Sequence, residues 1–167
     1  STTSQLALGD ALAIATIKYK KFGTQDFKKL HPSGSLGAQL KTVEDVMLVG
    51  NKIPFVNDKM KMDKALKVLT EKKLGILIVR NKTKSIGIIT DGQIRRYNEK
   101  YANLHTKKTK EIMTKNPVSV DKNILAAKAL AIMNSKKITS LCVYDNKNKN
   151  KTIGVVHIHN ILQFNIS

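Results

Sequence analysis

Two short groups of polar residues, each placed where an apolar run ends, have side chains suited to binding a small polar ligand. The first group is Thr90 and Gln93, and the second is His157, His159 and Asn160. A hydroxyl or an imidazole can donate a hydrogen bond to a phosphate, and an amide oxygen can accept one from a sugar hydroxyl. His157 and His159 could also present two imidazoles to a metal ion, but no Cys, Asp or Glu lies close by to complete a ligand set. We therefore expect no metal site, and a binding site instead of a catalytic one.

The two groups occupy matching places in a sequence that repeats after about 64 residues. The run DVM at 45–47 returns as EIM at 111–113, and GIIT at 87–90 returns as GVVH at 154–157. A unit of this size buries too little apolar surface to be stable alone. We therefore expect the two copies to pack on each other with pseudo-twofold symmetry around a shared cleft, which is a common place for a ligand.

The spacing of apolar residues predicts the same elements in both copies. One-sided helical spacing predicts helices over 62–72 and 124–133. Apolar runs joined by polar loops predict pairs of strands at 75–79 with 86–90, and at 139–144 with 153–157. A further helix is predicted over 5–22, before the repeats. The fold class is α/β, with domains predicted at 1–41, 42–104 and 105–167.

Four more residues are candidates for the wall of the shared cleft. Pro54 and Pro117 lie in matching extended segments, and Ile76 and Thr139 begin matching strands, Thr139 being followed by Ser140. Ordinary strand and turn chemistry explains these four residues equally well.

The net charge of +18 raises the question of nucleic-acid binding. All but three of the 30 basic residues are lysines, and they are scattered over predicted helices, loops and turns. Aromatic residues make up 5% of the chain and Trp is absent, so platforms on which bases could stack are scarce. We expect no specific nucleic-acid partner, although phosphorylated ligands should be attracted without specificity.

The compartment and the limits of the chain follow from three observations. The longest apolar runs are much shorter than the roughly 20 residues of a spanning helix, so no membrane partner is expected. The first residues contain neither Met nor a basic segment, which predicts a piece of a longer protein without a signal peptide. The single cysteine, Cys142, lies in an apolar strand pattern and indicates a reducing, cytoplasmic compartment.

The β-α-β-β-α order of each copy and the Gly-Ile/Val-Ile/Val strand end resemble the CBS domain, so the chain looks like a tandem CBS pair, or Bateman module, over about 42–164. In nucleotide-binding members of that family, an Asp three residues after the strand end accepts bonds from ribose. The matching positions here hold the amides Gln93 and Asn160, which puts adenosyl-nucleotide binding in doubt. Asp91 could partly substitute.

The segment before the repeats is similar to the junction between the sugar-isomerase domain and the CBS pair in D-arabinose-5-phosphate isomerases. The similarity rests on GDALA at 9–13 and HPSGSLG at 31–37. It implies a parent enzyme that interconverts ribulose 5-phosphate and arabinose 5-phosphate for Kdo and lipopolysaccharide synthesis, with His31 as its catalytic histidine. A histidine that only ends a helical turn before Pro32 is the other interpretation of His31.

The resemblance implies a regulatory and oligomerisation module that senses a nucleotide or nucleotide sugar. Its expected partners are an N-terminal sugar-isomerase domain and further copies of the chain, as a dimer or tetramer. No cofactor is expected, and the 167 residues alone are expected to lack isomerase activity. The alternative is a structural dimerisation module that binds no ligand.

Overall fold

The computed structural model describes residues 1–23, 26–27, 30 and 35–166. The chain forms two compact units, Ser1–Leu40 and Lys41–Ser167. His31, the candidate catalytic residue, lies outside the described residues, so its role stays a prediction. No helix in the described part of the chain has the length and apolarity to cross a membrane.

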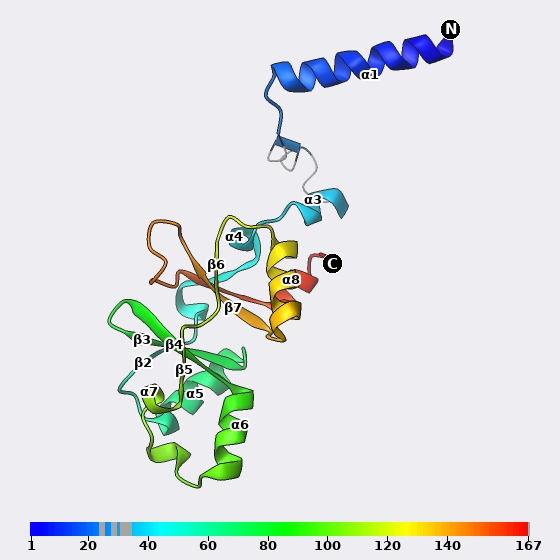
Figure 1. Ribbon diagram of the computed structural model, residues 1–167. Coiled ribbons are helices and arrows are strands. Elements are labelled where there is room, and N and C mark those ends of the chain that lie inside the picture. The colour runs from blue at the N-terminus through cyan, green and yellow to red at the C-terminus, as the bar shows by residue number, and fades with distance from the viewer. Residues whose placement is uncertain (24–25, 28–29, 31–34, 167) are drawn as a thin grey trace. The chain divides into compact units, whose positions relative to one another are not determined.

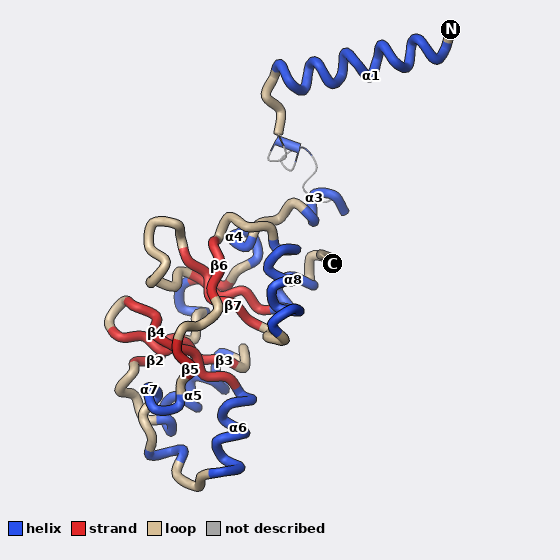
Figure 2. Tube along the Cα trace, viewed as in Figure 1, coloured by secondary structure: helices blue, strands red, loops and turns tan. Residues whose placement is uncertain are grey.

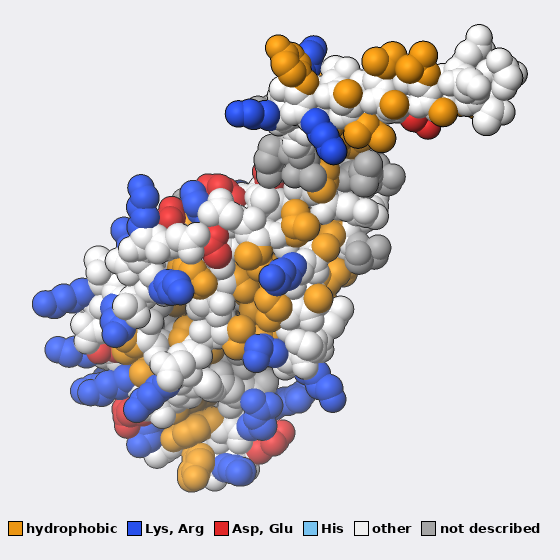
Figure 3. All heavy atoms as spheres, turned by 45° about the horizontal axis from the view of Figure 1, so that its top comes forward, with side chains coloured by type: hydrophobic (Ala, Val, Ile, Leu, Met, Phe, Trp, Pro, Cys, Tyr) orange, Lys and Arg blue, Asp and Glu red, His pale blue; other side chains and the backbone are white. Residues whose placement is uncertain are grey.

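The first unit contains a long helix with an exposed apolar surface. Helix α1 (Thr2–Tyr19) confirms the predicted helix, shifted by three residues, and none of its residues is buried. Its side chains Leu6, Leu8 and Leu12 are each at least 60% exposed, and Figure 3 shows hydrophobic side chains along this helix. The same unit contains α3 (Ser35–Gln39).

The second unit contains both sequence repeats, and Figure 1 shows the course of the chain through it. Its helices are α4 (Val43–Val46), η1 (Gly50–Lys52), α5 (Met62–Lys72), α6 (Asp91–Lys100), η2 (Leu104–Thr106), α7 (Thr109–Ile112), α8 (Ala126–Lys136) and α9 (Ile158–Leu162). Its strands are β1 (Leu48–Val49), β2 (Phe55–Asn57), β3 (Ile76–Asn81), β4 (Lys84–Thr90), β5 (Thr114–Lys115), β6 (Ser119–Asp121), β7 (Ser140–Tyr144) and β8 (Gly154–His157). The predicted β-α-β-β-α order is confirmed in both repeats.

The strands form two four-stranded sheets, and each repeat contributes one short strand to the sheet of the other. The sheet orders are β2-β3-β4-β5 and β1-β8-β7-β6. Strand β5 opens the second repeat but pairs with β4 of the first, with Thr114 opposite Ile88. Strand β1 opens the first repeat but pairs with β8 of the second, with Leu48 opposite Val155. The two repeats are therefore joined by exchanged strands as well as by packing.

The strands lie at the centre of this unit, with helices at both ends (Figure 2). Alternate residues of a strand point to opposite faces of its sheet. Leu77 and Val79 of β3 therefore enter a core with Met62 and Ala65 of α5. Their neighbours Ile76 and Ile78 enter a second core with Cys142 and Val155 of the other sheet. This second core confirms the expected packing of the repeats on each other.

Helix α5 has the bounds that the spacing predicts. It begins after Lys61 and ends at Lys72, and the next residue, Lys73, adopts a left-handed conformation with φ of 54°. Such a residue ends a helix because the chain can no longer continue the helical hydrogen bonds. The predicted domain boundary between residues 104 and 105 falls inside η2, and both predicted boundaries stay predictions.

Candidate ligand cleft between the repeats

A cleft of about 760 Å³ lies between the two repeats. This volume is within the usual range of roughly 300–1,000 Å³ for small-molecule sites. Both repeats contribute the connection between a helix and the following strand, and the residues at the end of a strand. The lining residues are Lys73, Leu74, Gly75, Ile76, Ile88, Thr90, Asp91, Gly92, Gln93, Arg96, Thr114, Asn116, Pro117, Val118, Lys137, Ile138, Thr139, Ser140, His157 and His159.

Positive charge predominates in the cleft wall. The lining includes the cations Lys73, Arg96 and Lys137, but a single carboxylate, Asp91. Lys73 and Lys137 are 64 residues apart in the repeat, and each ends a helix in the left-handed conformation, with φ of 54° and 53°. Two equivalent backbone turns thus bring one lysine from each repeat to the same cleft. A cleft with this balance of charge attracts anions.

Thr90 and Gln93 form the beginning of α6. The hydroxyl of Thr90 accepts a hydrogen bond from the backbone N–H of Gln93 at 3.3 Å. In return, Oε1 of Gln93 accepts one from the backbone N–H of Thr90 at 2.9 Å. The amide nitrogen of Gln93 donates to the hydroxyl of Thr114, which belongs to the second repeat. Gln93 therefore caps a helix and links the two repeats.

His157 and Asn160 form the same type of cap at α9. Nδ1 of His157 accepts a hydrogen bond from the backbone N–H of His159 at 3.2 Å, and Oδ1 of Asn160 accepts one from the backbone N–H of His157 at 3.2 Å. Burial lowers the pKa of His157, and the nearby His159 lowers it further. Because the cap requires an unprotonated Nδ1, the neutral imidazole is the form that fits this structure.

Ser140 is the unsatisfied polar group of the cleft. The residue is 6% exposed, and its buried hydroxyl has no hydrogen-bond partner among the residues that the structure describes. A buried hydroxyl without a partner costs about 1–3 kcal/mol, so such groups are usually bonded to something. Ser140 is one of the residues that line the cleft, but its hydroxyl oxygen itself is covered by the surrounding wall.

The cleft brings together all but two of the nine residues predicted to bind a ligand. Ile76, Thr90, Gln93, Pro117, Thr139, His157 and His159 line it. Pro54 does not: it is buried, and its carbonyl accepts a hydrogen bond from the backbone N–H of Ile78 at 2.9 Å. Asn160 also lies outside the lining, and its side chain serves the α9 cap. Whether the seven bind a ligand stays a prediction.

The cleft is also lined by four residues that were not predicted from the sequence: Lys73, Lys137, Arg96 and Asn116. The two lysines had a usable signal, since Lys73 directly follows the helix predicted over 62–72 and Lys137 lies 64 residues later, at the equivalent place in the repeat. Arg96 and Asn116 had none, because their places depend on how α6 and the exchanged strand β5 approach the cleft. In the part of the chain that the structure describes, no group of three His, Cys, Asp or Glu is placed to hold a metal ion.

Two β-α-β-β-α units that exchange strands and share a cleft define a tandem α/β domain pair. The family model of the CBS domain matches residues 43–100 and 110–166, and the chain belongs to the CBS domain family. The tandem CBS pair expected from the sequence is thus confirmed.

Curated proteins and solved structures extend this result. The chain is 40% identical over 167 residues to the arabinose 5-phosphate isomerase KdsD of Francisella tularensis, a match that covers 99% of this chain and 50% of that protein. The chain therefore spans about half the length of this curated relative, and its expected similarity to arabinose 5-phosphate isomerases is confirmed.

Solved structures share the fold. One is a crystal structure of CBSX2 in complex with AMP, which is 24% identical with a TM-score of 0.64 and covers 73% of this chain and 93% of its own. Another is the CBS domain of a bacterial CNNM/CorC family Mg²⁺ transporter in complex with ATP, which is 17% identical with a TM-score of 0.64 and covers 84% of this chain and 96% of its own.

Proposed function

We propose that this chain is the regulatory CBS pair of a cytoplasmic D-arabinose-5-phosphate isomerase, and that its cleft binds a nucleotide or nucleotide sugar. The convergence of the cations Lys73, Arg96 and Lys137 on one cleft between the repeats carries this proposal. A phosphorylated ligand would supply negative charge for Lys73 and Lys137.

The relatives support both halves of the proposal. The KdsD relatives are named for the isomerase reaction, and structures that share the fold are complexes with AMP and ATP. By this account the parent enzyme interconverts ribulose 5-phosphate and arabinose 5-phosphate in a separate sugar-isomerase domain. His31 would contribute to its active site, and the apolar residues of α1 would pack within the parent enzyme.

Regulation would depend on the location of the cleft between the two repeats. Both repeats line it, so a ligand contacts both sides and its affinity depends on how the repeats are arranged. A ligand shifts a conformational equilibrium only by its difference in affinity between the two states. The module would also hold copies of the enzyme together as a dimer or tetramer.

Thermal unfolding of the 167-residue chain tests ligand binding. We would measure the melting temperature at physiological salt with AMP, ATP, a cytidine nucleotide or CMP-Kdo, and use inorganic tripolyphosphate to measure the effect of charge alone. A specific ligand raises the melting temperature by mass action, more at higher ligand concentration. We expect one nucleotide or nucleotide sugar to give a larger shift than tripolyphosphate at equal concentration.

A matched pair of lysine variants locates the effect in the cleft. Lys137→Asn removes a cleft charge at a residue with φ of 53°, and Lys82→Asn removes a lysine with φ of 52° in the β3–β4 hairpin. Asn tolerates this backbone conformation, so the two variants differ mainly in their distance from the cleft. We expect Lys137→Asn alone to weaken binding, by about tenfold. Equal shifts with every anion, or equal effects of the two variants, would contradict the proposal and favour a structural dimerisation module.

A further inference from the structure

The two halves of the cleft differ at one pair of equivalent positions. In the first repeat, the backbone N–H of Asp91 donates a hydrogen bond to the carbonyl of Gly75 at 3.0 Å. In the second repeat, Ile158 and Thr139 make the same backbone bond at 2.8 Å. The first half thus has a carboxylate beside a glycine, where the second has an apolar side chain beside a threonine.

Gly75 leaves the space that the Asp91 carboxylate occupies. A β-carbon added to Gly75 would lie 2.9 Å from Oδ2 of Asp91, and the φ of +65° at Gly75 also disfavours any side chain there. Asp91 lines the cleft and is exposed. In the described structure its carboxylate makes no ion pair and no hydrogen bond, so it is available to accept bonds from a ligand.

Gln93 and Asn160 stand where nucleotide-binding CBS pairs resemble this chain but have a ribose-binding Asp. Both side chains already make hydrogen bonds within the protein. Oε1 of Gln93 accepts from the backbone N–H of Thr90 at 2.9 Å and from its hydroxyl at 3.3 Å, and the amide nitrogen of Gln93 donates to Thr114. Oδ1 of Asn160 accepts from His157. Binding a ligand diol through Oε1 of Gln93, which already accepts two bonds, would compete with the α6 cap. Asn160 lies outside the cleft lining, whereas Asp91 lies in it.

We propose that Asp91 determines specificity in this cleft by accepting hydrogen bonds from adjacent hydroxyl groups of a phosphorylated polyol. The polyol is either the ribose of a nucleotide or a sugar phosphate. A carboxylate among three cations repels a bare polyphosphate, so it discriminates against anions that have no hydroxyl groups to donate. Because Ile158 replaces it in the second half, the ligand binds in one orientation, with its hydroxyl groups toward the first repeat. This inference rests on the proposed ligand-binding function.

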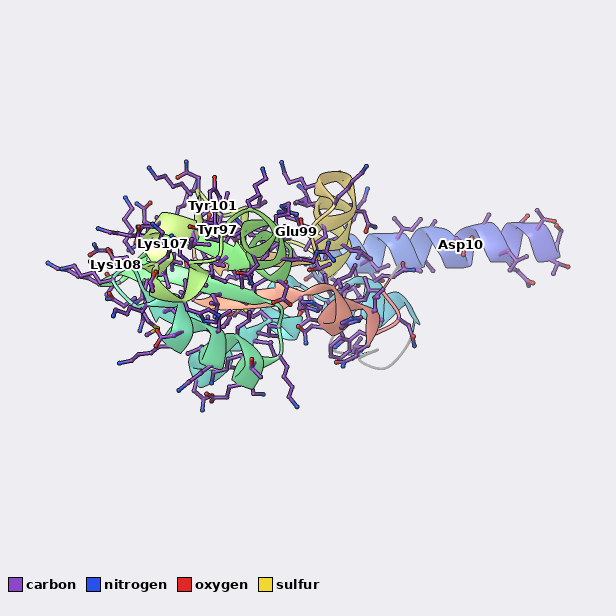
Figure 4. All side chains as sticks on the ribbon, turned by 90° about the horizontal axis from the view of Figure 1, so that it is seen from below. Asp10, Tyr97, Glu99, Tyr101, Lys107 and Lys108 are labelled. Atoms are coloured by element: carbon purple, nitrogen blue, oxygen red, sulfur yellow. The ribbon has the colours of Figure 1, made fainter. Side chains whose placement is uncertain are left out.

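Calorimetric titration of the full chain and its Asp91→Asn variant tests the inference. The ligands are AMP, 2′-deoxy-AMP, ribose 5-phosphate and tripolyphosphate. Glu99→Gln removes the same charge further along α6, where Figure 4 labels Glu99. Glu99 is not among the residues that line the cleft, so this variant serves as the matched control. We expect Asp91→Asn to weaken the binding of AMP about tenfold and to abolish the preference for AMP over 2′-deoxy-AMP. The binding of tripolyphosphate should be unchanged or tighter. Glu99→Gln should leave all four affinities close to those of the unmodified chain.

The direction in which Asp91→Asn changes each ligand affinity distinguishes the inference from a general effect of charge. If Asp91 acts only through its charge, Asp91→Asn tightens every anion alike, and the inference is wrong. A second variant, Asp91→Glu, keeps the charge but moves the carboxylate, and should lose the diol preference while tripolyphosphate binds as before.

The comparison of ribose 5-phosphate with AMP identifies the class of ligand. If ribose 5-phosphate binds as tightly as AMP, the ligand is a sugar phosphate, and if AMP binds more tightly, the ligand is a nucleotide; both results support the inference. If no ligand binds the unmodified chain better than tripolyphosphate does, the proposed function itself fails, and the inference with it.

Discussion

The sulfur of Met113 lies directly over Gly87, so that a β-carbon added to Gly87 would be 2.5 Å from it. Met113 precedes the exchanged strand β5, and Gly87 lies in β4, the strand with which β5 pairs. The equivalent pair is Met47 over Gly154, with the same distance of 2.5 Å. In each case the methionine that opens one repeat packs against a glycine of the other. These glycines recur in the sequence because strand exchange brings the chain this close.

Gly87→Ala should therefore destabilise the CBS pair. The new methyl group would meet the Met113 sulfur and also the backbone carbonyl of Thr114 at 2.9 Å. Overpacking of this kind costs typically about 1–3 kcal/mol, and the loss should appear as a lower midpoint of urea unfolding. Gly9→Ala is the control, because no atom of the described residues lies within 4 Å of a β-carbon added there. A Gly87→Ala variant as stable as Gly9→Ala would show that the exchanged strand does not pack as described.

The hydrogen bond between Gln93 and Thr114 should couple the two repeats energetically. Gln93→Ala removes this bond together with the α6 cap, and we expect a loss of about 1–2 kcal/mol in the free energy of unfolding. Thr114→Val removes only the partner hydroxyl. In a double-mutant cycle, the two changes should fall short of additivity by about 0.5–1.5 kcal/mol. Strict additivity would mean that the side chains do not interact.

Stability should decrease below neutral pH because of His157. Burial lowers its pKa in the folded protein, whereas the unfolded chain has the ordinary value of about 6.5. As the pH falls through about 6.5, the unfolded chain therefore binds a proton more readily and the free energy of unfolding decreases. His157→Asn keeps a side chain able to cap α9 and should flatten this dependence in urea unfolding between pH 7.5 and 5.5. Equal slopes for the two proteins would assign the effect to other groups.

Cys142 should be unreactive in the folded protein. Burial raises the pKa of its thiol from 9.0 to about 11, which by itself lowers the thiolate fraction at pH 8 about a hundredfold. An aromatic disulfide reagent should label it at least that much more slowly in buffer than in denaturing urea. Equal labelling rates would place the thiol at the surface and contradict the core between the sheets.

Local patterns in the sequence predicted helix α5 correctly but misplaced the start of α8. Ile124 and Leu125 continue the apolar pattern of a helix, yet Leu125 is extended and α8 begins at Ala126. The reason is a contact with a distant segment: the backbone N–H of Ala126 donates to the carbonyl of Lys41 at 2.8 Å, and Val43 donates to Ile124 at 2.9 Å. Tertiary hydrogen bonds of this kind leave no periodic signal in the sequence.

The candidate site was predicted from the same patterns only in part. The repeat located the strand ends, and with them Thr90 and His157 in the cleft wall. It did not show that Gln93 and Asn160 cap helices, because an amide three residues after a Thr or His is compatible with both roles. The exchanged strands β1 and β5 are two residues long, too short for any alternation to appear. Asn116 reaches the cleft because of that exchange, so the sequence pattern could not predict its place either.

The most direct test of the account is to record amide spectra of the isotope-labelled chain during titration with the nucleotide or nucleotide sugar that stabilises it most. We predict that the largest shift changes occur at Gly75, Asp91, Thr139 and Ser140, on both sides of the shared cleft, and that tripolyphosphate does not reproduce them. Changes confined to exposed lysine-rich loops, such as the one following Asp145, or no changes at all, would contradict a ligand site between the repeats.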